Sequence, residues 1–341
     1  MKISSDVLKE KLKYINFGVS KNNTDSYKYR AIRFETINGV VYCYSNDTIN
    51  HVKVEIGPTD KDFAATIDFA VFSNFIKSCD GDITLDTTAK GLSVKTNVVK
   101  AKLPAYENKS GTNGIPAPII KDCNTELSEE FRLDLIKLIL DANHPVEAYQ
   151  KVYFGDTMMV SDTDNVLVYE KKYFDSNIML NLTSVELLSN LTNAKYSIET
   201  DNNISILYVE ADELSARIIG GSNADGEYQY EDLDELFTVC TGDNVEIDTK
   251  VLSKAMSTSQ LFKVVPELVF SKKGVHLNID SVDFSYIISD TPCEDKKIVL
   301  DPKVSKKICT IGDTVTIYYN CDEESLIKVE HDDVREILSW R

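Results

Sequence analysis

The sequence repeats one pattern of elements three times, with a period of about 110 residues. The first half of the pattern is a strand end, a polar cap and an amphipathic helix, in "MKISSDVLKEKLKYI", "TELSEEFRLDLIKLIL" and "VEIDTKVLSKAMSTS". The second half is again a strand, a cap and a helix, in "AATIDFAVFSNFIKSC", "IMLNLTSVELLSN" and "IVLDPKVSKKIC". Alternating strands follow each helix. A unit of this size that recurs three times predicts three similar domains rather than one continuous core.

Each helix of the second half begins after a residue suited to capping. Asp68, Asn181 and Asp301 stand directly before the helical pattern, where a side-chain oxygen can accept from free amides of the first turn. Pro302 follows at the first helical position, where its missing N–H is not needed. In the helices, apolar residues recur at spacings of three and four residues. In the strands, apolar and polar residues alternate. The predicted fold class is α+β, with three similar domains of two helices plus antiparallel sheets each.

Two segments rich in glycine, asparagine or acidic residues separate the repeats. Residues 107–121 read "ENKSGTNGIPAPIIK", and residues 220–235 read "GGSNADGEYQYEDLDE". Such composition is typical of linkers. We therefore expect domains at residues 1–115, 116–226 and 227–341.

The net charge of −18 argues against a simple nucleic-acid binder, whose surface is usually basic. Hydrophobic residues make up 43% of the chain, as in ordinary globular proteins. No apolar run approaches the roughly 20 residues of a membrane span. The N-terminus carries charges where a signal peptide would be apolar. We expect no membrane association and a cytoplasmic location.

The seven cysteines are odd in number and include no C-x-x-C pair. This spacing argues against a disulfide framework and a zinc site, so we expect small buried thiols in a reducing compartment. The four histidines are scattered, and the sequence contains no phosphate-binding loop motif. No paired carboxylate site emerges either. The sequence therefore predicts no cofactor, no metal, no catalytic residue and no enzymatic activity.

Four local strings, taken in order, resemble one known family. They are "YSNDTINHVKVEI", "KAKLPAYEN", "VSDTDNVLVYEKK" and "ARIIGGSNADGEYQY". Together with the domain count and the element order, they make the chain similar to the bacterial sliding clamp, the β subunit of DNA polymerase III, over essentially its whole length. The chain is somewhat shorter than typical cellular clamps and its third domain is the most divergent. This suggests a phage or otherwise diverged version.

The resemblance implies a function without chemistry of its own. In this family two chains close head to tail into a ring, with the helices facing the hole and the sheets outside. The ring is a processivity factor for DNA replication, which encircles duplex DNA of any sequence and tethers the replicative polymerase through a peptide-binding pocket. The implied partners are double-stranded DNA, the polymerase, the clamp loader and a second copy of the chain. The implied location is the cytoplasm of a bacterial or phage-infected cell.

The acidic charge lies off the predicted helices. The six helical segments carry a net charge of +4, so the remainder carries −22. Lysines on the helices can then act on nearby phosphates, because salt screens a more distant acidic shell over roughly 10 Å. Ordinary solvated helix faces would look the same, and on the first helix of domain two only two basic residues offset four acids. The candidate DNA-binding residues are Lys9, Lys13, Lys21, Lys77, Arg132, Lys137, Lys250, Lys254, Lys303, Lys306 and Lys307.

The resemblance also implies two apolar sites. The partner-peptide pocket of the family lies between domains two and three and is completed by the C-terminal residues. The corresponding residues here are Tyr153, Thr163, Leu167, Leu338 and Trp340. Leu261 and Phe262, which follow a third-domain helix, resemble the family's apolar dimer interface. Each of these residues could equally be ordinary core.

Two other functions stay open at this level. One is an open monomer that binds DNA through surface charge, which needs a basic face that a net charge of −18 makes harder to supply. The other is a structural or virion protein built from repeated α+β domains, which predicts no charge bias toward the helices. The ring needs about twice the chain mass of 38.3 kDa, so the mass in solution separates it from a monomer.

Overall fold

The computed structural model describes residues 1–22, 24–88, 91–106, 115–142, 151–161, 165–201, 204–221, 237–238, 240–321 and 326–339. These residues belong to two compact units, Met1–Leu133 with Thr183–Gly221 and Asp134–Leu182 with Ser222–Arg341. Most of both predicted linkers lies outside the described residues. The predicted domain boundaries therefore stay predictions.

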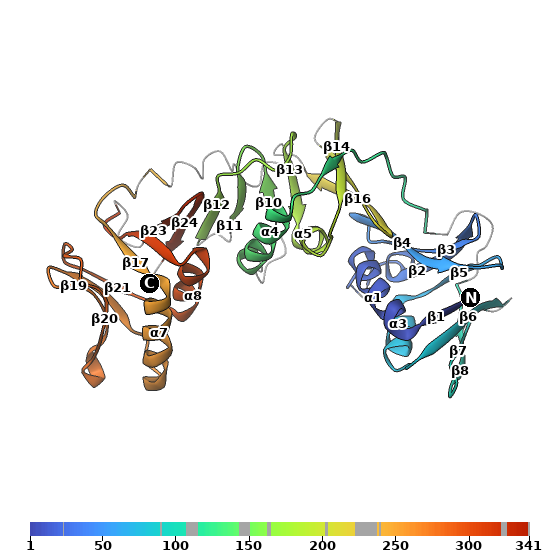
Figure 1. Ribbon diagram of the computed structural model, residues 1–341, viewed down its shortest axis with the longest axis horizontal. Helices are drawn as coiled ribbons and strands as arrows, with labels where there is room; N and C mark the ends of the chain where they lie inside the picture. The colour runs from blue at the N-terminus through green and yellow to red at the C-terminus, as the bar shows by residue number, and fades with distance from the viewer. Residues whose placement is uncertain are drawn as a thin grey trace. The chain divides into compact units, whose positions relative to one another are not determined.

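Repeat one contains two long helices and eight strands among its described residues. Helices α1 (Ser5–Ile15) and α3 (Phe69–Lys77) lie side by side (Figure 1). A 3-10 turn, η1 (Asn16–Gly18), and a short helix, α2 (Tyr27–Arg30), follow α1. The strands are β1 (Lys2–Ser4), β2 (Ala31–Ile37), β3 (Val40–Asn46), β4 (Asn50–Pro58), β5 (Ala64–Asp68), β6 (Asp82–Thr88), β7 (Gly91–Lys95) and β8 (Lys100–Pro104).

Repeat two follows the same element order in its described residues. Its long helices are α4 (Glu129–Ala142) and α5 (Leu182–Ser189). Its strands are β9 (Thr125–Glu126), β10 (Lys151–Phe154), β11 (Met158–Ser161), β12 (Asn165–Tyr169), β13 (Ile178–Asn181), β14 (Lys195–Asp201), β15 (Ile204–Ala211) and β16 (Leu214–Gly221).

Repeat three has the same plan again. Its helices α7 (Thr249–Ser259) and α8 (Pro302–Ile311) pack together (Figure 1). Two 3-10 turns, η4 (Gln260–Phe262) and η5 (Asp280–Val282), complete it. Its strands are β17 (Asn244–Asp248), β18 (Glu267–Ser271), β19 (Gly274–Ile279), β20 (Phe284–Ser289), β21 (Lys296–Val299), β22 (Thr314–Tyr318), β23 (Leu326–His331) and β24 (Val334–Ser339).

Strand pairing is the same in all three repeats, and it is antiparallel throughout. In repeat one the strands pair in the orders β1-β6-β7-β8 and β4-β3-β2-β5. Repeat two has the orders β9-β14-β15-β16 and β12-β11-β10-β13. Repeat three has β17-β22-β23-β24 and β20-β19-β18-β21. The repetition predicted from sequence is therefore a repetition of topology.

The last strand of one repeat pairs with the fourth strand of the repeat before it. In joint one, β16 pairs with β4 and Leu214 stands opposite Val54. In joint two, β24 pairs with β12 and Val334 stands opposite Tyr169. The two strands left over by this rule are β8 of repeat one and β20 of repeat three, each of which is the outermost strand of its described four-stranded sheet.

Local sequence accounts for the element boundaries. Asp68 accepts a hydrogen bond from the Val71 amide at 3.0 Å, and Asp301 accepts one from the Lys303 amide at 2.7 Å, so both predicted caps are confirmed. The turn between β2 and β3 is Asn38–Gly39, with φ values of 52° and 78°. These left-handed values match a tight hairpin, and they suit asparagine and glycine better than other residues.

Burial of one face holds each helix to its sheets. Leu8 of α1, Phe72 of α3, Leu252 of α7 and Ile308 of α8 have no exposed surface. Burial of each such side chain contributes about 1.5–3 kcal/mol relative to its exposure. The polar faces of these helices are left to solvent. Every helix among the described residues is too short or too polar to cross a membrane.

One pair of cysteines departs from the sequence-based expectation. Cys240 and Cys321 form a disulfide across 81 residues, whereas Cys43, Cys79, Cys123, Cys293 and Cys309 are free thiols. The prediction of free thiols throughout is therefore wrong for this pair. The cause is topological, because antiparallel pairing of β17 with β22 brings the residues just before β17 and just after β22 together.

Candidate functional site

The exposed faces of the repeat-one and repeat-three helices carry unpaired lysines. Lys77 on α3, Lys254 on α7, and Lys303 and Lys306 on α8 are exposed. In the described part of the chain, no carboxylate lies within ion-pair distance of these four side chains. Lys21, in the loop after η1, is also exposed. These five predicted residues are available to an external anion.

Other predicted lysines are engaged within the chain. Lys9 donates to the Cys79 carbonyl at 2.9 Å and lies 3.9 Å from the Asp80 carboxylate. Lys13 lies 2.6 Å from the Glu10 carboxylate one turn away. A phosphate near these residues would have to compete with existing partners.

Two lysines of repeat three are also engaged. Lys250 on α7 lies 3.1 Å from the Asp313 carboxylate, and both side chains are exposed, so water screens this pair. Lys307 on α8 is only 20% exposed and lies 3.8 Å from Glu336, which is buried in β24. Lys307 therefore acts inside the fold, and its predicted role toward DNA is weaker than that of Lys303 and Lys306.

The two predicted DNA-binding residues of repeat two, Arg132 and Lys137, pair with acidic residues of their own helix. Arg132 donates from Nε to Glu129 at 2.8 Å, and this hydrogen bond lowers the pKa of the Glu129 carboxyl. Lys137 lies 3.8 Å from Asp134. Both pairs join residues one turn apart on α4. Helix α4 therefore offers less free positive charge than the helices of repeats one and three, as its sequence already indicates.

An apolar cluster occupies one face of joint two. This joint cluster consists of Tyr153, Met159, Val166, Val168, Phe237, Cys240, Cys321 and Ile337, with Met179, Tyr318 and Leu326 packed against it. Tyr153 is 9% exposed, so its ring is largely covered. Phe237 and the two cysteines are members that sequence reasoning missed. Only the strand pairing of the folded chain shows that they lie beside Tyr153.

The predicted pocket residues do not all gather at this cluster. Val166, Val168 and Ile337 face it, and side chains alternate along a strand. Leu167 on β12 and Leu338 on β24 therefore point to the opposite face of the sheet, where they are 3% and 0% exposed. A peptide on the joint cluster would not touch them. Thr163 and Trp340 lie outside the described residues.

The predicted interface pair lies in an exposed apolar surface of repeat three. Leu261 and Phe262, in η4, are 78% and 39% exposed. The Phe262 ring lies 5.2 Å from that of Phe284, at the start of β20. Val264, Val265 and Ile287 are also exposed. We call Leu261, Phe262, Val264, Val265 and Ile287 the β20 surface. Exposed apolar patches often take part in protein–protein contacts, so the β20 surface is a candidate interaction site.

Repeat one also exposes apolar side chains beside its free edge strand. Val98 and Val99, in the turn between β7 and β8, are 92% and 45% exposed. The equivalent turns of repeats two and three carry acidic pairs, Asp212–Glu213 and Asp332–Asp333. The turn that borders β8 is therefore apolar where its counterparts are charged.

The fold is shared with known proteins. The sequence matches no family model and no curated protein sequence. In structure, the chain is similar to the Helicobacter pylori β clamp bound to a DNA ligase peptide, with 15% identity, a TM-score of 0.76, and coverage of 100% of this chain and 99% of that one.

Two further structures agree with this match. The DNA polymerase III β subunit of Thermotoga maritima and the C. crescentus β sliding clamp each give 12% identity and a TM-score of 0.76, with coverage of 100% of this chain and 98% of theirs. No repeat is left unmatched in any of these comparisons. The predicted fold class is confirmed, and the chain has the fold of the bacterial β sliding clamps from end to end.

Proposed function

We propose that this protein is a DNA sliding clamp, a polymerase processivity factor that encircles duplex DNA. The observation that carries the proposal is the full-length likeness to β clamps together with a topology that, among the described residues, leaves one edge of β8 and one edge of β20 unpaired. The function needs no reaction at the protein itself. The implied role is that of an accessory subunit in DNA replication.

Ring closure follows from the rule that joins the repeats. Within the chain, the eighth strand of a repeat pairs with the fourth strand of the preceding one, as β16 with β4 and β24 with β12. By the same rule, β8 of one copy would pair with β20 of a second copy. Both edges present unpaired backbone groups, which makes them templates for strand addition. Two copies joined head to tail in this way give a closed ring.

Side chains next to these edges support the same contact. The β20 surface is apolar, and so is the turn that holds Val98 and Val99. Apolar residues in the core of an interface lose water on association, which stabilises the dimer.

Free helix lysines supply the DNA contact. Lys77, Lys254, Lys303 and Lys306 can each approach a phosphate without breaking an ion pair. Phosphate contacts of this kind carry no sequence information and weaken as salt rises. Weak and interchangeable contacts suit a ring that must slide. Repeats one and three then carry most of the DNA contact.

The joint cluster is the proposed docking surface for partner peptides. The H. pylori β clamp binds a DNA ligase peptide, and we take that peptide, the ligase peptide below, as the first probe for this chain. Tyr153 supplies an amphipathic aromatic side chain at the cluster, a residue type that often dominates binding energy. The replicative polymerase and the clamp loader are the expected physiological partners.

Charge reversal on α8 tests the DNA contact. Lys303→Glu with Lys306→Glu should abolish retention on nicked circular DNA, while exposed positions shift stability by under about 0.5 kcal/mol. Lys272→Glu with Lys273→Glu, in the exposed β18–β19 turn, makes the same change in net charge away from the helices and should retain DNA. Equal retention by the two variants would remove α8 from the DNA contact.

Disruption of the β20 surface tests ring closure. Leu261→Lys with Phe262→Lys should convert a species of about twice 38.3 kDa into a folded monomer, as measured by light scattering. Ile119→Lys with Ile204→Lys changes two similarly exposed apolar residues elsewhere and should stay dimeric. A wild-type chain that is monomeric at all concentrations would favour the open form.

A further inference from the structure

The disulfide joins two segments within repeat three that are distant in sequence. Cys240 precedes β17 and Cys321 follows β22, and the ladder between these strands continues outward through a hydrogen bond from the Tyr319 amide to the Asp243 carbonyl at 3.1 Å. The two cysteines are therefore brought together by the fold itself. The β17–β22 pairing itself is made by backbone hydrogen bonds and not by the disulfide.

The bond lies in the joint cluster, as does the aromatic side chain of Phe237. Phe237 is three residues before Cys240 in sequence and is 4% exposed. The Arg335 guanidinium covers its ring at 4.6 Å, a cation–π contact. Because the bond anchors Cys240, only three residues after Phe237, it limits how far that ring can move from the cluster while the bond is intact.

The other cysteines have no comparable arrangement. None of the five free thiols forms a second disulfide among the described residues. Burial raises the pKa of Cys309 to about 11 and raises the pKa of Cys43 and Cys79 as well. Thiols with raised pKa values hold little thiolate at neutral pH and react slowly. A response of this chain to small thiols would therefore centre on Cys240 and Cys321.

We propose that Cys240–Cys321 is a thiol–disulfide latch that holds Phe237 on the joint cluster when oxidised and frees it when reduced, so that reduction uncovers an apolar surface for partner peptides. The identity of that peptide rests on the proposed clamp function. The latch itself rests only on the bond and on the position of Phe237 in the cluster.

The exchange chemistry is balanced with a small-molecule thiol such as glutathione. A glutathione thiolate attacks Sγ of Cys321, which is 7% exposed, whereas Cys240 has no exposed surface. The S–S bond breaks, and Cys240 leaves as a thiolate that takes a proton. A second glutathione then cleaves the mixed disulfide, giving glutathione disulfide and a protein dithiol. Glutathione disulfide drives the reverse reaction, and a thiol-rich compartment favours the reduced, open form.

The test uses the full chain equilibrated in glutathione buffers of different ratio, with free thiols counted by maleimide labelling and mass spectrometry. Reduction should add two labels and increase the emission of the apolar dye anilinonaphthalene sulfonate. The labelled ligase peptide should bind the oxidised chain at least about tenfold more weakly, because affinity falls with the fraction of open molecules. Phe237→Ala should keep the bond yet bind dye and peptide equally in both states.

Matched variants separate the latch from general effects of reduction. Cys309→Ser removes a thiol outside the pair and should switch like wild type, whereas Cys240→Ser with Cys321→Ser should stay open in every buffer. If that double variant does not fold, hydrogen exchange of wild type decides, and the Phe237 and Thr238 amides should exchange faster only after reduction.

Two results would overturn the latch. One is a wild-type chain whose dye binding and amide exchange ignore the redox state, and the other is a Phe237→Ala variant that still switches. A dye response without any peptide binding would support the latch and reject the peptide assignment. Loss of DNA retention has no bearing on these readouts, so failure of the clamp proposal would be seen separately.

Discussion

The two joints share a backbone plan but differ in the side chains that secure it. In joint one the Glu55 amide donates to the Glu213 carbonyl at 2.8 Å, and in joint two the Glu170 amide donates to the Asp333 carbonyl at 2.8 Å. These pairs are equivalent by register, because each lies directly beyond the first paired residues of its joint, Val54 opposite Leu214 and Tyr169 opposite Val334. Strand register has thus been kept between repeats, whereas the charged groups around it have not.

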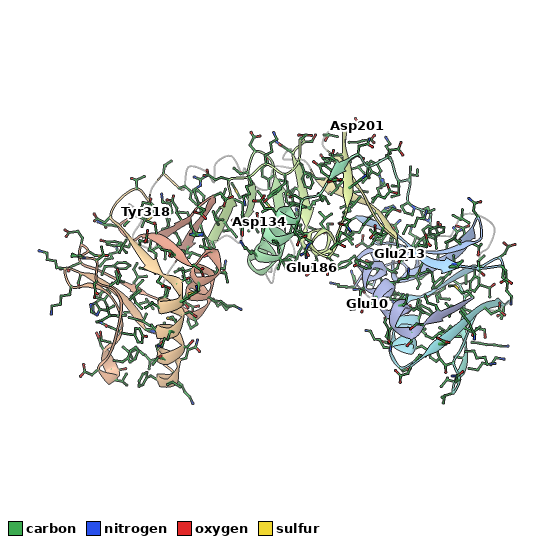
Figure 2. The ribbon with its side chains drawn as sticks, viewed as in Figure 1. Glu10, Asp134, Glu186, Asp201, Glu213 and Tyr318 are labelled. Carbon is green, nitrogen blue, oxygen red and sulfur yellow. A yellow bond between two sulfur atoms is a disulfide. The ribbon has the colours of Figure 1, made fainter. Side chains whose placement is uncertain are left out.

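Joint one relies on a single buried lysine. Lys11 of α1 is 8% exposed, and its Nζ donates to the Glu55 carbonyl at 2.6 Å and to the Glu213 carboxylate. The Glu213 side chain is 60% exposed and lies at the turn beside α1 (Figure 2). Lys11 is therefore shielded from water, whereas the Glu213 carboxylate is solvated.

Joint two relies on a buried carboxylate in a network. Asp134, on α4 (Figure 2), has a side chain that is 6% exposed and accepts from Tyr173 Oη and from Lys171 Nζ, the latter at 3.1 Å. Lys171 also lies 2.7 Å from Asp333. In joint two the buried group is a carboxylate, and several hydrogen-bond donors surround it. The comparison teaches that the cost of breaking a joint depends on which partner stays behind in the interior.

The largest effect is expected at Asp134. Asp134→Ala removes the acceptor of the Tyr173 hydroxyl and one of the two carboxylates at Lys171, and each hydrogen bond to a charged group contributes about 1.5–3 kcal/mol. The urea midpoint should fall, and amides of the β12–β24 ladder should exchange faster while those of β4–β16 do not.

Asp134→Asn is the matched control, because it keeps an acceptor oxygen of similar size. It should lose clearly less stability than Asp134→Ala. Equal losses for the two variants would mean that volume, and not the hydrogen-bonded network, secures joint two.

An intermediate effect is expected at joint one, and it should be asymmetric. Lys11→Met leaves Glu213, which water can solvate, so the cost should be about 1 kcal/mol. Glu213→Ala leaves the Lys11 ammonium in the interior with the Glu55 carbonyl, so the cost should be larger, about 2 kcal/mol. Denaturant unfolding of both variants measures the difference. A greater loss for Lys11→Met would contradict the argument from the group left behind.

The repeat pattern made the fold predictable, since caps such as Asp68 and Asp301 and the period of the helices are local properties of the sequence. The disulfide was not predictable in the same way, because its cysteines are 81 residues apart and meet only through strand pairing. Pairing also decided which pocket candidates share a face. Alternation separates Leu167 from Val166 and Val168, but its consequence needs the register with β24.

Ion pairing was equally hidden from the sequence. Lys77 and Lys9 look alike as helix lysines, yet Lys77 is exposed and Lys9 donates to the Cys79 carbonyl. A charge count over a helix treats them as equal. Only the packing of α1 against α3 shows which lysine is free to meet a phosphate.

The smallest effect is expected from acid, and it should appear at joint one alone. His51 on β4 stands opposite Arg217 on β16, whereas the equivalent pair of joint two is Val166 opposite Ile337. Burial, and then the charge of Arg217, lowers the pKa of His51 below its ordinary value of 6.5. A lowered pKa means that the folded chain favours neutral imidazole. The contribution to stability is therefore complete above about 6.5 and is lost as pH falls through the folded value.

Amide exchange of the two ladders, corrected for the intrinsic rate at each pH, measures this difference within one sample. On acidification the β4–β16 amides should lose protection relative to the β12–β24 amides. Asp47, in the turn before His51, has a pKa raised by burial, so its protonation opposes the loss and keeps the effect small. His51→Val copies the residue of joint two and should remove the difference. If the amide protection of the two ladders still diverges with pH in His51→Val, another group causes the acid sensitivity.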